Sequence, residues 1–253
     1  MRILLTNDDG INAAGFGVLQ QLAAELGDEV WSVAPESDQS GTAHSLTLHE
    51  PLRCRPMGER EFAVRGTPTD CVIMAVGHLM PHKPDLILSG VNHGENAAGD
   101  VTYSGTIAGA IEGTLIGIPS IALSLGMGGR DAATAHWDTP LQHGPPLIKK
   151  LVAAGWPANV LINVNFPDCG PADVKPAMVA RQSTHEGTLW NIVDRMDKRG
   201  KAYFWVGYEP RDKAAPKGTD LWAIQRQHIS VTPLHLDLTH DETAAKLTRQ
   251  LGG

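Results

Sequence analysis

Two short apolar segments separated by one amphipathic segment fill the first 35 residues, and this pattern strongly restricts the fold. Residues 2–6 and 29–34 are typical of buried strands, and residues 15–26 carry apolar side chains at helical spacing. A strand–helix–strand unit requires parallel strands joined by a right-handed crossover. Further strands are expected at 46–55, 61–65, 85–89, 119–125, 159–164 and 229–236, and helices from 68, at 104–116 and at 242–251. The pattern predicts an α/β fold with a Rossmann-like, doubly wound, mostly parallel sheet.

Residues 181–220 differ in character from the rest of the chain. They are richer in charge, and the turn signal D-K-R-G at 197–200 precedes an aromatic strand at 202–208. A hairpin outside the main sheet has little core of its own, so a partner subunit would cover it. We expect residues 1–253 to form a single domain, with 181–220 as a projecting C-terminal β-hairpin arm used for self-association.

Charge and cysteine content limit the classes of partner. The formal net charge of the 253 residues is −7, whereas general nucleic-acid binders are more often basic. We therefore expect no duplex nucleic-acid partner, and an anion must be held by local features. Cys54, Cys71 and Cys169 are odd in number and far apart, which favours a reducing compartment. We find no targeting signal, and the most apolar stretch, 111–125, is too broken to span a bilayer, so we expect a cytoplasmic protein without membrane association.

Two adjacent carboxylates, Asp8 and Asp9, directly follow the first strand. Neighbouring side chains of a strand point to opposite faces, so both can face one point only if the backbone turns, which Asn7 and Gly10 permit. Two carboxylates in one pocket repel each other unless a cation lies between them, and oxygen ligands suit Mg²⁺, Mn²⁺ or Ca²⁺. The alternative is a polar turn in which one aspartate caps the next helix.

Three more polar loops follow predicted strands or open a predicted helix. They are Ser40-Gly41-Thr42, residues 89–96 with Asn92 and Asn96, and Ser104-Gly105-Thr106. In open α/β sheets, ligands bind beyond the carboxyl ends of the strands. A helix start rich in Ser, Gly and Thr presents free backbone N–H groups to an anion. Each loop alone could be a plain turn or helix cap, but together they suggest a hard metal beside a phosphate, and hence phosphoester hydrolysis.

Several other nucleotide-binding and hydrolase motifs are missing. The chain contains no G-x-G-x-x-G after the first strand, no G-x-x-x-x-G-K-[ST], no G-x-S-x-G and no H-E-x-x-H. A Rossmann dinucleotide site, a P-loop, a serine nucleophile elbow and a zincin site are therefore disfavoured.

Six blocks, in order along the chain, resemble the SurE (survival protein E) family of metal-dependent nucleotidases. They are residues 1–11 (M-R-I-L-L-T-N-D-D-G-I), 33–35 with 40–41 (V-A-P, S-G), 66–71 (G-T-P-T-D-C), 89–96 (S-G-V-N-H-G-E-N), 103–106 (Y-S-G-T) and 230–234 (S-V-T-P-L). An N-terminal N-D-D-G with a later S-G-x-N-x-G-x-N is highly specific. The resemblance covers nearly the whole chain.

The resemblance implies 5′- and 3′-nucleotidase activity on nucleoside monophosphates. It implies one divalent metal per subunit, Mg²⁺ or Mn²⁺, held by Asp8, Asp9, Ser40 and Asn92. It implies phosphate binding by Asn96, Ser104, Gly105 and Thr106. Asp8 and Asp9 would be the catalytic residues, each as general base, nucleophile or ligand only. Family members form dimers and tetramers through an exchanged C-terminal arm, which agrees with the interpretation of residues 181–220.

The chain departs from the family pattern at one place, and two functions other than nucleotidase activity remain as alternatives. Gln227 and His228 stand where the family has a glycine and then an aromatic residue, which puts the local turn and its contacts in question. An exopolyphosphatase is one rival, with Lys149-Lys150 and residues 195–201 contributing to a basic groove. A nucleotide-binding protein without turnover is the other.

Overall fold

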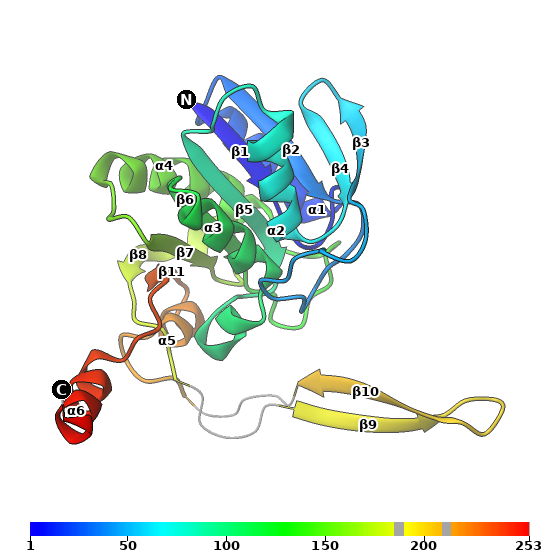
Figure 1. Cartoon of the computed structure of the whole chain (residues 1–253). Helices are drawn as coiled ribbons and strands as arrows, with labels where there is room; N and C mark the ends of the chain where they lie inside the picture. The colour runs from blue at the N-terminus through cyan, green and yellow to red at the C-terminus, as the bar shows by residue number, and fades with distance from the viewer. Residues whose placement is uncertain (185–189, 209–213, 253) are drawn as a thin grey trace.

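A nine-stranded sheet forms the centre of the computed structural model, which describes residues 1–184, 190–208 and 214–252 (Figure 1). Its strand order is β3-β4-β2-β1-β5-β6-β7-β11-β8. The strands are β1 (Arg2–Thr6), β2 (Glu29–Pro35), β3 (Arg53–Gly58), β4 (Glu61–Arg65), β5 (Leu86–His93), β6 (Ser120–Leu125), β7 (Val160–Phe166), β8 (Lys175–Val179) and β11 (His228–His235). Strands β4, β2, β1, β5, β6 and β7 are mutually parallel, whereas β3 and β11 run antiparallel to β4 and β7. The prediction of a doubly wound, mostly parallel sheet is confirmed.

Helices cover both faces of this sheet (Figure 1). The longer ones are α1 (Ala14–Ala24), α2 (Pro68–Met74), α3 (Gly105–Leu115), α4 (Asp138–Ala154) and α6 (Asp241–Leu251), and the shorter ones are η1 (Ala75–Leu79), η2 (Ala98–Thr102), η3 (Pro171–Asp173) and α5 (Asp220–Gln225). Alternate residues of β1 enter different cores: Ile3 and Leu5 pack with α1, and Leu4 packs with α2. Strands buried on both faces read as continuous apolar runs, which is why residues 2–6 have no polar alternation.

The chain winds in opposite directions on the two sides of the boundary between β1 and β5. From β1 it proceeds to β2 and β4, and from β5 it proceeds the other way to β6 and β7. Such a boundary leaves a crevice beyond the carboxyl ends of the two strands, where doubly wound proteins bind their ligands. The segments after Thr6 and around Asn92 both lie at this switch point.

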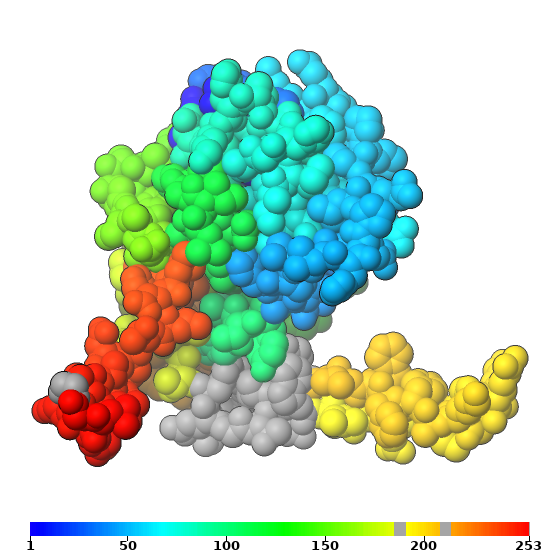
Figure 2. All heavy atoms as spheres, in the orientation of Figure 1, coloured from blue at the N-terminus to red at the C-terminus, as the bar shows by residue number. Residues whose placement is uncertain are grey.

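A two-stranded antiparallel hairpin projects from the body of the molecule (Figure 2). It consists of β9 (Trp190–Met196) and β10 (Ala202–Tyr208), joined by a turn in which Asp197 N donates to Lys201 O at 2.9 Å. The predicted projecting arm is confirmed as a structural element; parts of the range 181–220, namely 185–189 and 209–213, lie outside the described residues. Helix α6 also lies apart from the sheet, and none of its residues is buried.

Some predictions of local structure were wrong or incomplete. Helix α4 was not predicted, because Pro145 and Pro146 interrupt its pattern. The strand expected at 46–55 begins only at Arg53, since Thr47 bonds Asp70 through both its N–H and its hydroxyl, at 3.1 and 2.6 Å. The three cysteines are unpaired. Within the described ranges, no helix is both long enough and apolar enough to cross a bilayer.

The departure at Gln227 and His228 leaves the turn in place. Gln227 adopts a left-handed conformation (φ +65°), the region that glycine favours, and its N–H donates to Ile224 O at 3.0 Å. For a non-glycine residue this conformation costs about 1 kcal/mol. His228 stacks on Trp222 and its Nδ1 lies 2.8 Å from Pro176 O. The strain is therefore held by contacts on both sides of the turn.

Candidate functional site

Asp8 and Asp9 lie in a sharp turn at the end of β1. The Asn7 amide donates to Gly10 O at 2.9 Å, and Gly10 has a φ of +98° that only glycine adopts without strain. Asp8 is 4% exposed and Asp9 is partly buried. The turn predicted from N-D-D-G is therefore present, and it holds one carboxylate inside the protein and the other at the rim.

Burial dominates the electrostatics of this carboxylate pair. It raises the pKa of Asp8 from 3.8 to about 6; hydrogen bonds from Thr106 oppose the rise, and the charge of Asp9 adds to it. The pKa of Asp9 is also raised, first by burial, against a hydrogen bond from the His93 backbone and with a contribution from Asp38. Two desolvated carboxylates side by side are costly unless a cation or proton shares the site.

The start of α3 lies directly against Asp8. Ser104 caps the helix by accepting a hydrogen bond from Ile107 N at 3.0 Å, and the Thr106 hydroxyl donates to Asp8 Oδ1. A Cβ on Gly105 would lie 2.7 Å from Asp8 Cβ, so only glycine lets the helix approach this closely. The predicted anion-binding residues Ser104, Gly105 and Thr106 are thus beside the predicted metal ligands.

The loop after β2 contacts the same turn, although Ser40 does not bond either aspartate. Gln39 N donates to Asp8 O at 2.8 Å, which attaches the loop to the site. The Ser40 hydroxyl and N–H both donate to Asp38 Oδ1, at 2.6 and 2.7 Å. Asp38 was not among the predicted site residues. Its carboxylate now fixes Ser40 and raises the pKa of Asp9.

The end of β5 completes this edge of the site. The pairing of β5 with β6 shifts register between Ser89 and Asn92, and His93 N donates to Asp9 Oδ2 at 3.1 Å. The Asn92 amide donates to Gly94 O at 2.8 Å. Its amide oxygen is a neutral ligand of the type that hard cations accept.

Asn96 is held in a buried polar network with Ser124, Asn163 and Asn165, none of which is a predicted site residue. Its amide donates to Ser124 Oγ at 2.9 Å and its N–H donates to Asn165 Oδ1 at 2.8 Å. Its carbonyl accepts from Asn163 Nδ2 at 2.7 Å and from Asn165 Nδ2 at 3.2 Å. Asn163 and Asn165 were not among the predicted site residues, yet two asparagines inside the apolar run L-I-N-V-N-F were a usable signal.

The donor set fits a hard divalent cation. The groups gathered here are two carboxylates and neutral oxygens, and Asn7 Oδ1 is buried without a hydrogen-bond partner. Within the described ranges, no group of three or more His, Cys, Asp or Glu side chains is arranged to hold a metal ion. The candidate donors are therefore of mixed kind: carboxylate, amide and hydroxyl oxygens.

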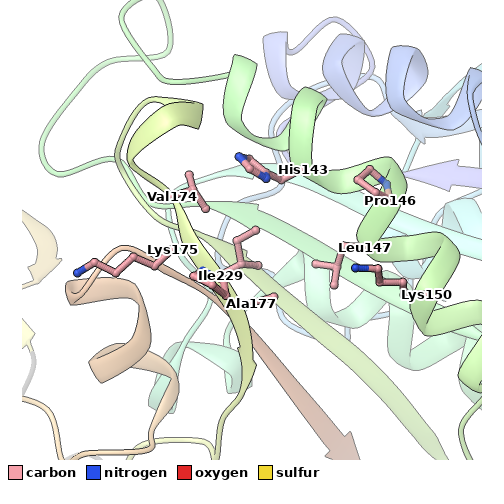
Figure 3. Close-up of a pocket in the computed structure, with 9 residues that line it drawn as sticks. His143, Pro146, Leu147, Lys150, Val174, Lys175, Ala177 and Ile229 are labelled. Atoms are coloured by element: carbon pink, nitrogen blue, oxygen red, sulfur yellow. The ribbon is translucent and has the colours of Figure 1, made fainter.

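A separate cavity of about 280 Å³ lies between α4 and β8 (Figure 3). Lys150 and Lys175 line it together with His143, Leu147 and Ile229, and none of the predicted site residues does. Lys150 is one of the two lysines considered for a polyphosphate groove.

The sheet defines a doubly wound α/β protein, and the carboxylates at its switch point, with the start of α3 packed against Asp8, form an oxygen-lined candidate site. The family model described as "Survival protein SurE" matches residues 3–188, and the chain belongs to this family. The proteins named 5′-nucleotidase SurE from Parvibaculum lavamentivorans and Brucella anthropi are 53% and 55% identical to it; 100% of this chain and 91% and 98% of theirs are covered. The crystal structure of the SurE protein from Aquifex aeolicus superposes with a TM-score of 0.85 at 37% identity, covering 99% of each chain.

Proposed function

We propose that this chain is a metal-dependent phosphomonoesterase that hydrolyses nucleoside 5′-monophosphates, and also 3′-monophosphates, to nucleoside and phosphate. The observation that carries the proposal is the buried Asp8 carboxylate, which lies beside Asp9 and against the start of α3. The names of the relatives at 53% and 55% identity support a nucleotidase. The unpaired cysteines suit a reducing compartment, so we also propose a cytoplasmic location.

Asp8, Asp9, Ser40 and Asn92 would hold one Mg²⁺ or Mn²⁺ per subunit. Bound there, such a cation polarises a phosphoryl oxygen and lowers the pKa of a bound water. The Thr106 hydroxyl orients the Asp8 carboxylate, and the His93 N–H orients that of Asp9. Each contact restrains one carboxylate, and in this proposal either carboxylate could accept a proton from the attacking water.

The phosphate of the substrate would bind at the start of α3. The first N–H groups of a helix have no partner within the helix, and the positive end of its dipole favours an anion. Gly105 has no side chain to block the approach, and Ser104 and Thr106 flank it. Asn96 would act on the same phosphate from the loop before η2, where four hydrogen bonds already restrain it.

The arm would join subunits into a dimer or tetramer. Several large apolar side chains of β9 and β10 are about two-thirds exposed in the single chain, namely Ile192 65%, Met196 65%, Phe204 64%, Trp205 65% and Val206 64%. A second copy that covers them removes this apolar surface from water.

The test is phosphate release from a panel of nucleoside 5′- and 3′-monophosphates after chelation, with Mg²⁺, Mn²⁺ or Zn²⁺ restored in turn. Release that returns with Mg²⁺ or Mn²⁺ is expected and would rank the bases and the two phosphate positions. Release in full chelator would contradict the metal requirement. Binding of nucleotide without release would favour the nucleotide-binding alternative, and release only from polyphosphate would favour an exopolyphosphatase.

The Asp9→Asn variant tests the assignment of the site. We expect turnover to fall at least about a thousandfold, because metal-assisted catalysis supplies several kcal/mol of transition-state stabilisation. Asp241→Asn, in the exposed first turn of α6, is the matched control and keeps full activity. Wild-type turnover in Asp9→Asn would remove Asp9 from the mechanism.

A further inference from the structure

Ala98, two residues after Asn96, has an unusual backbone conformation held from outside its own loop. Its φ is +53°, in the left-handed region that alanine rarely adopts. Its N–H donates to Asp220 Oδ2 at 2.9 Å, and its carbonyl accepts from Gln182 Nε2 at 2.6 Å. Both backbone polar groups of this residue are therefore bound by side chains from the C-terminal third of the chain.

Asp220 is fully buried (0% exposed) and binds two segments at once. Its Oδ2 takes the bond from Ala98, and its Oδ1 accepts from Ser183 N at 2.9 Å and Leu221 N at 2.8 Å. A buried carboxylate is stable only when such donors surround it. Asp220 has no part in the proposed chemistry. Its hydrogen bonds to Ala98, Ser183 and Leu221 therefore need another explanation.

The segment held by this carboxylate is the root of the arm. Arg181 bridges to Thr219 and donates its N–H to Gly218 O at 3.0 Å, and its own carbonyl accepts from Asp220 N at 2.8 Å. Gln182 and Ser183 follow, and β9 begins at Trp190. The root of the arm and the loop before α3 are thus joined through Asp220 and Gln182.

We propose that Asp220 and Gln182 form a clamp on Ala98. The clamp holds residues 96–104, and with them the start of α3, in the conformation that binds phosphate. The inference rests on the proposed function, since it assumes that the substrate phosphate binds at the start of α3. Asn163 and Asn165 anchor the loop at Asn96, and the clamp anchors it at Ala98. In this proposal Asp220 and Gln182 contact no reacting atom and are positioning residues. They connect the loop before α3 to the root of the arm.

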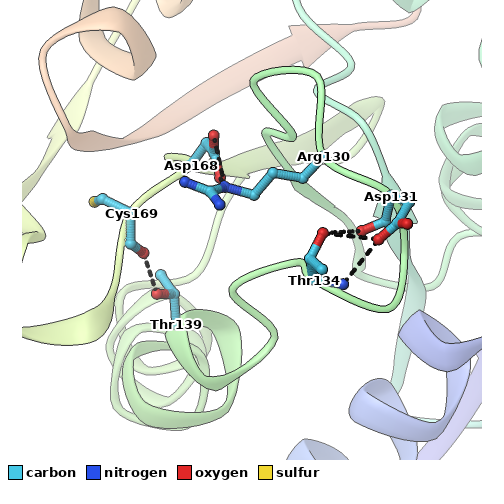
Figure 4. A network of polar contacts seen from close by, with 6 residues as sticks. All are labelled: Arg130, Asp131, Thr134, Thr139, Asp168 and Cys169. Carbon is cyan, nitrogen blue, oxygen red and sulfur yellow. Dashed lines mark hydrogen bonds and ion pairs between the residues drawn. The ribbon is translucent and has the colours of Figure 1, made fainter.

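Three variants separate this role from plain stability. Asp220→Asn keeps an acceptor for Ser183 and Leu221 but turns an amide toward the Ala98 N–H, so it breaks the clamp on the loop side. Gln182→Met removes only the donor to Ala98 O. Thr139→Val is the matched control, because it removes a 2.6 Å bond from a buried side chain to a backbone carbonyl, that of Cys169, elsewhere in the molecule (Figure 4).

The readouts are kcat, KM for a nucleoside 5′-monophosphate, and the inhibition constant of inorganic phosphate, all in the full chain with metal. We expect Asp220→Asn to raise KM and the inhibition constant about tenfold or more with little change in kcat, and Gln182→Met to raise them about fivefold, while Thr139→Val leaves them unchanged. Adding Ala98→Gly to Asp220→Asn should recover part of the loss, since glycine adopts a positive φ without the clamp.

Equal inhibition constants of phosphate in Gln182→Met and Thr139→Val would overturn the clamp. This comparison is valid even if Asp220→Asn does not fold. A wild-type chain that releases no phosphate would defeat the proposed function instead. Amide hydrogen exchange then decides the clamp: faster exchange of residues 96–104 in Gln182→Met than in Thr139→Val supports it, and equal exchange overturns it.

Discussion

The switch-point site and the arm are built in opposite ways. At the site, the turn after β1, the loop after β2, the end of β5 and the start of α3 are bonded to one another, and Asp8 is 4% exposed. In the arm, β9 pairs only with β10 among the described strands, and Trp205 is 65% exposed. The first region is bonded together by groups of one chain, whereas the second exposes the kind of surface that proteins usually bury.

The two regions therefore differ in what fixes their conformation. Side chains from distant parts of the chain restrain the site, so its shape is set when the sheet forms. An isolated two-stranded hairpin is marginally stable in water. Phe204 and Trp205 of the arm are exposed in the single chain, and the proposed clamp at Asp220 is the point at which the two regions meet.

The largest effect on stability is expected from the titration of Asp8 in protein from which metal has been removed by a chelator. The pKa of Asp8 is about 6 in the folded chain against 3.8 for an ordinary aspartate, so its contribution to stability is full below about pH 4 and is lost as the pH rises through 6. The loss amounts to about 3 kcal/mol. Urea unfolding between pH 4 and 7 measures it as the difference between wild type and Asp8→Asn. A constant difference across this range would show that Asp8 is not desolvated.

The next effect comes from adding one methyl group where the site is tightest. Gly105→Ala would push a Cβ to within 2.7 Å of Asp8 Cβ and displace the carboxylate. We expect activity to fall about a hundredfold, as small misplacements of catalytic groups do. Gly17→Ala in α1 is the control, because a Cβ there meets nothing within 4 Å. Steady-state kinetics on both variants checks the result, and equal activities would mean that α3 can move away from Asp8.

The smallest energetic effect is expected in the arm. Replacing Phe204 and Trp205 by serine should change the unfolding free energy of the single chain by no more than about 0.5 kcal/mol, because both side chains are exposed there. The same change should reduce the mass measured by sedimentation to that of a monomer. Lys198→Ser in the turn of the hairpin is the control. An unchanged mass in the Phe204 and Trp205 variant would separate the arm from self-association.

Much of the sheet and of the site was predictable because the signals are local. Apolar runs marked β1, β2, β5 and β6, and N-D-D-G marked a turn that needs Gly10 at a positive φ. Helix α4 was missed because Pro145 and Pro146 hide its period. The role of Asp220 was also missed, since nothing near it in sequence identifies Ala98 and Ser183 as its hydrogen-bond partners. Asp38 was missed although its partner Ser40 is only two residues away, because its effect on Asp9 arises across the fold.

The sequence by itself determined most of the strands, the polar turns that follow β1, β2 and β5, and where glycine is required. Only the tertiary structure decided which of these turns meet. Strand order brings the ends of β1 and β5 together at the switch point, and Ala98 takes its left-handed conformation from a carboxylate 122 residues away. The physical reason is one of range: side-chain period and turn chemistry act over a few residues, whereas a hydrogen-bond partner across the fold exists only after the sheet has formed.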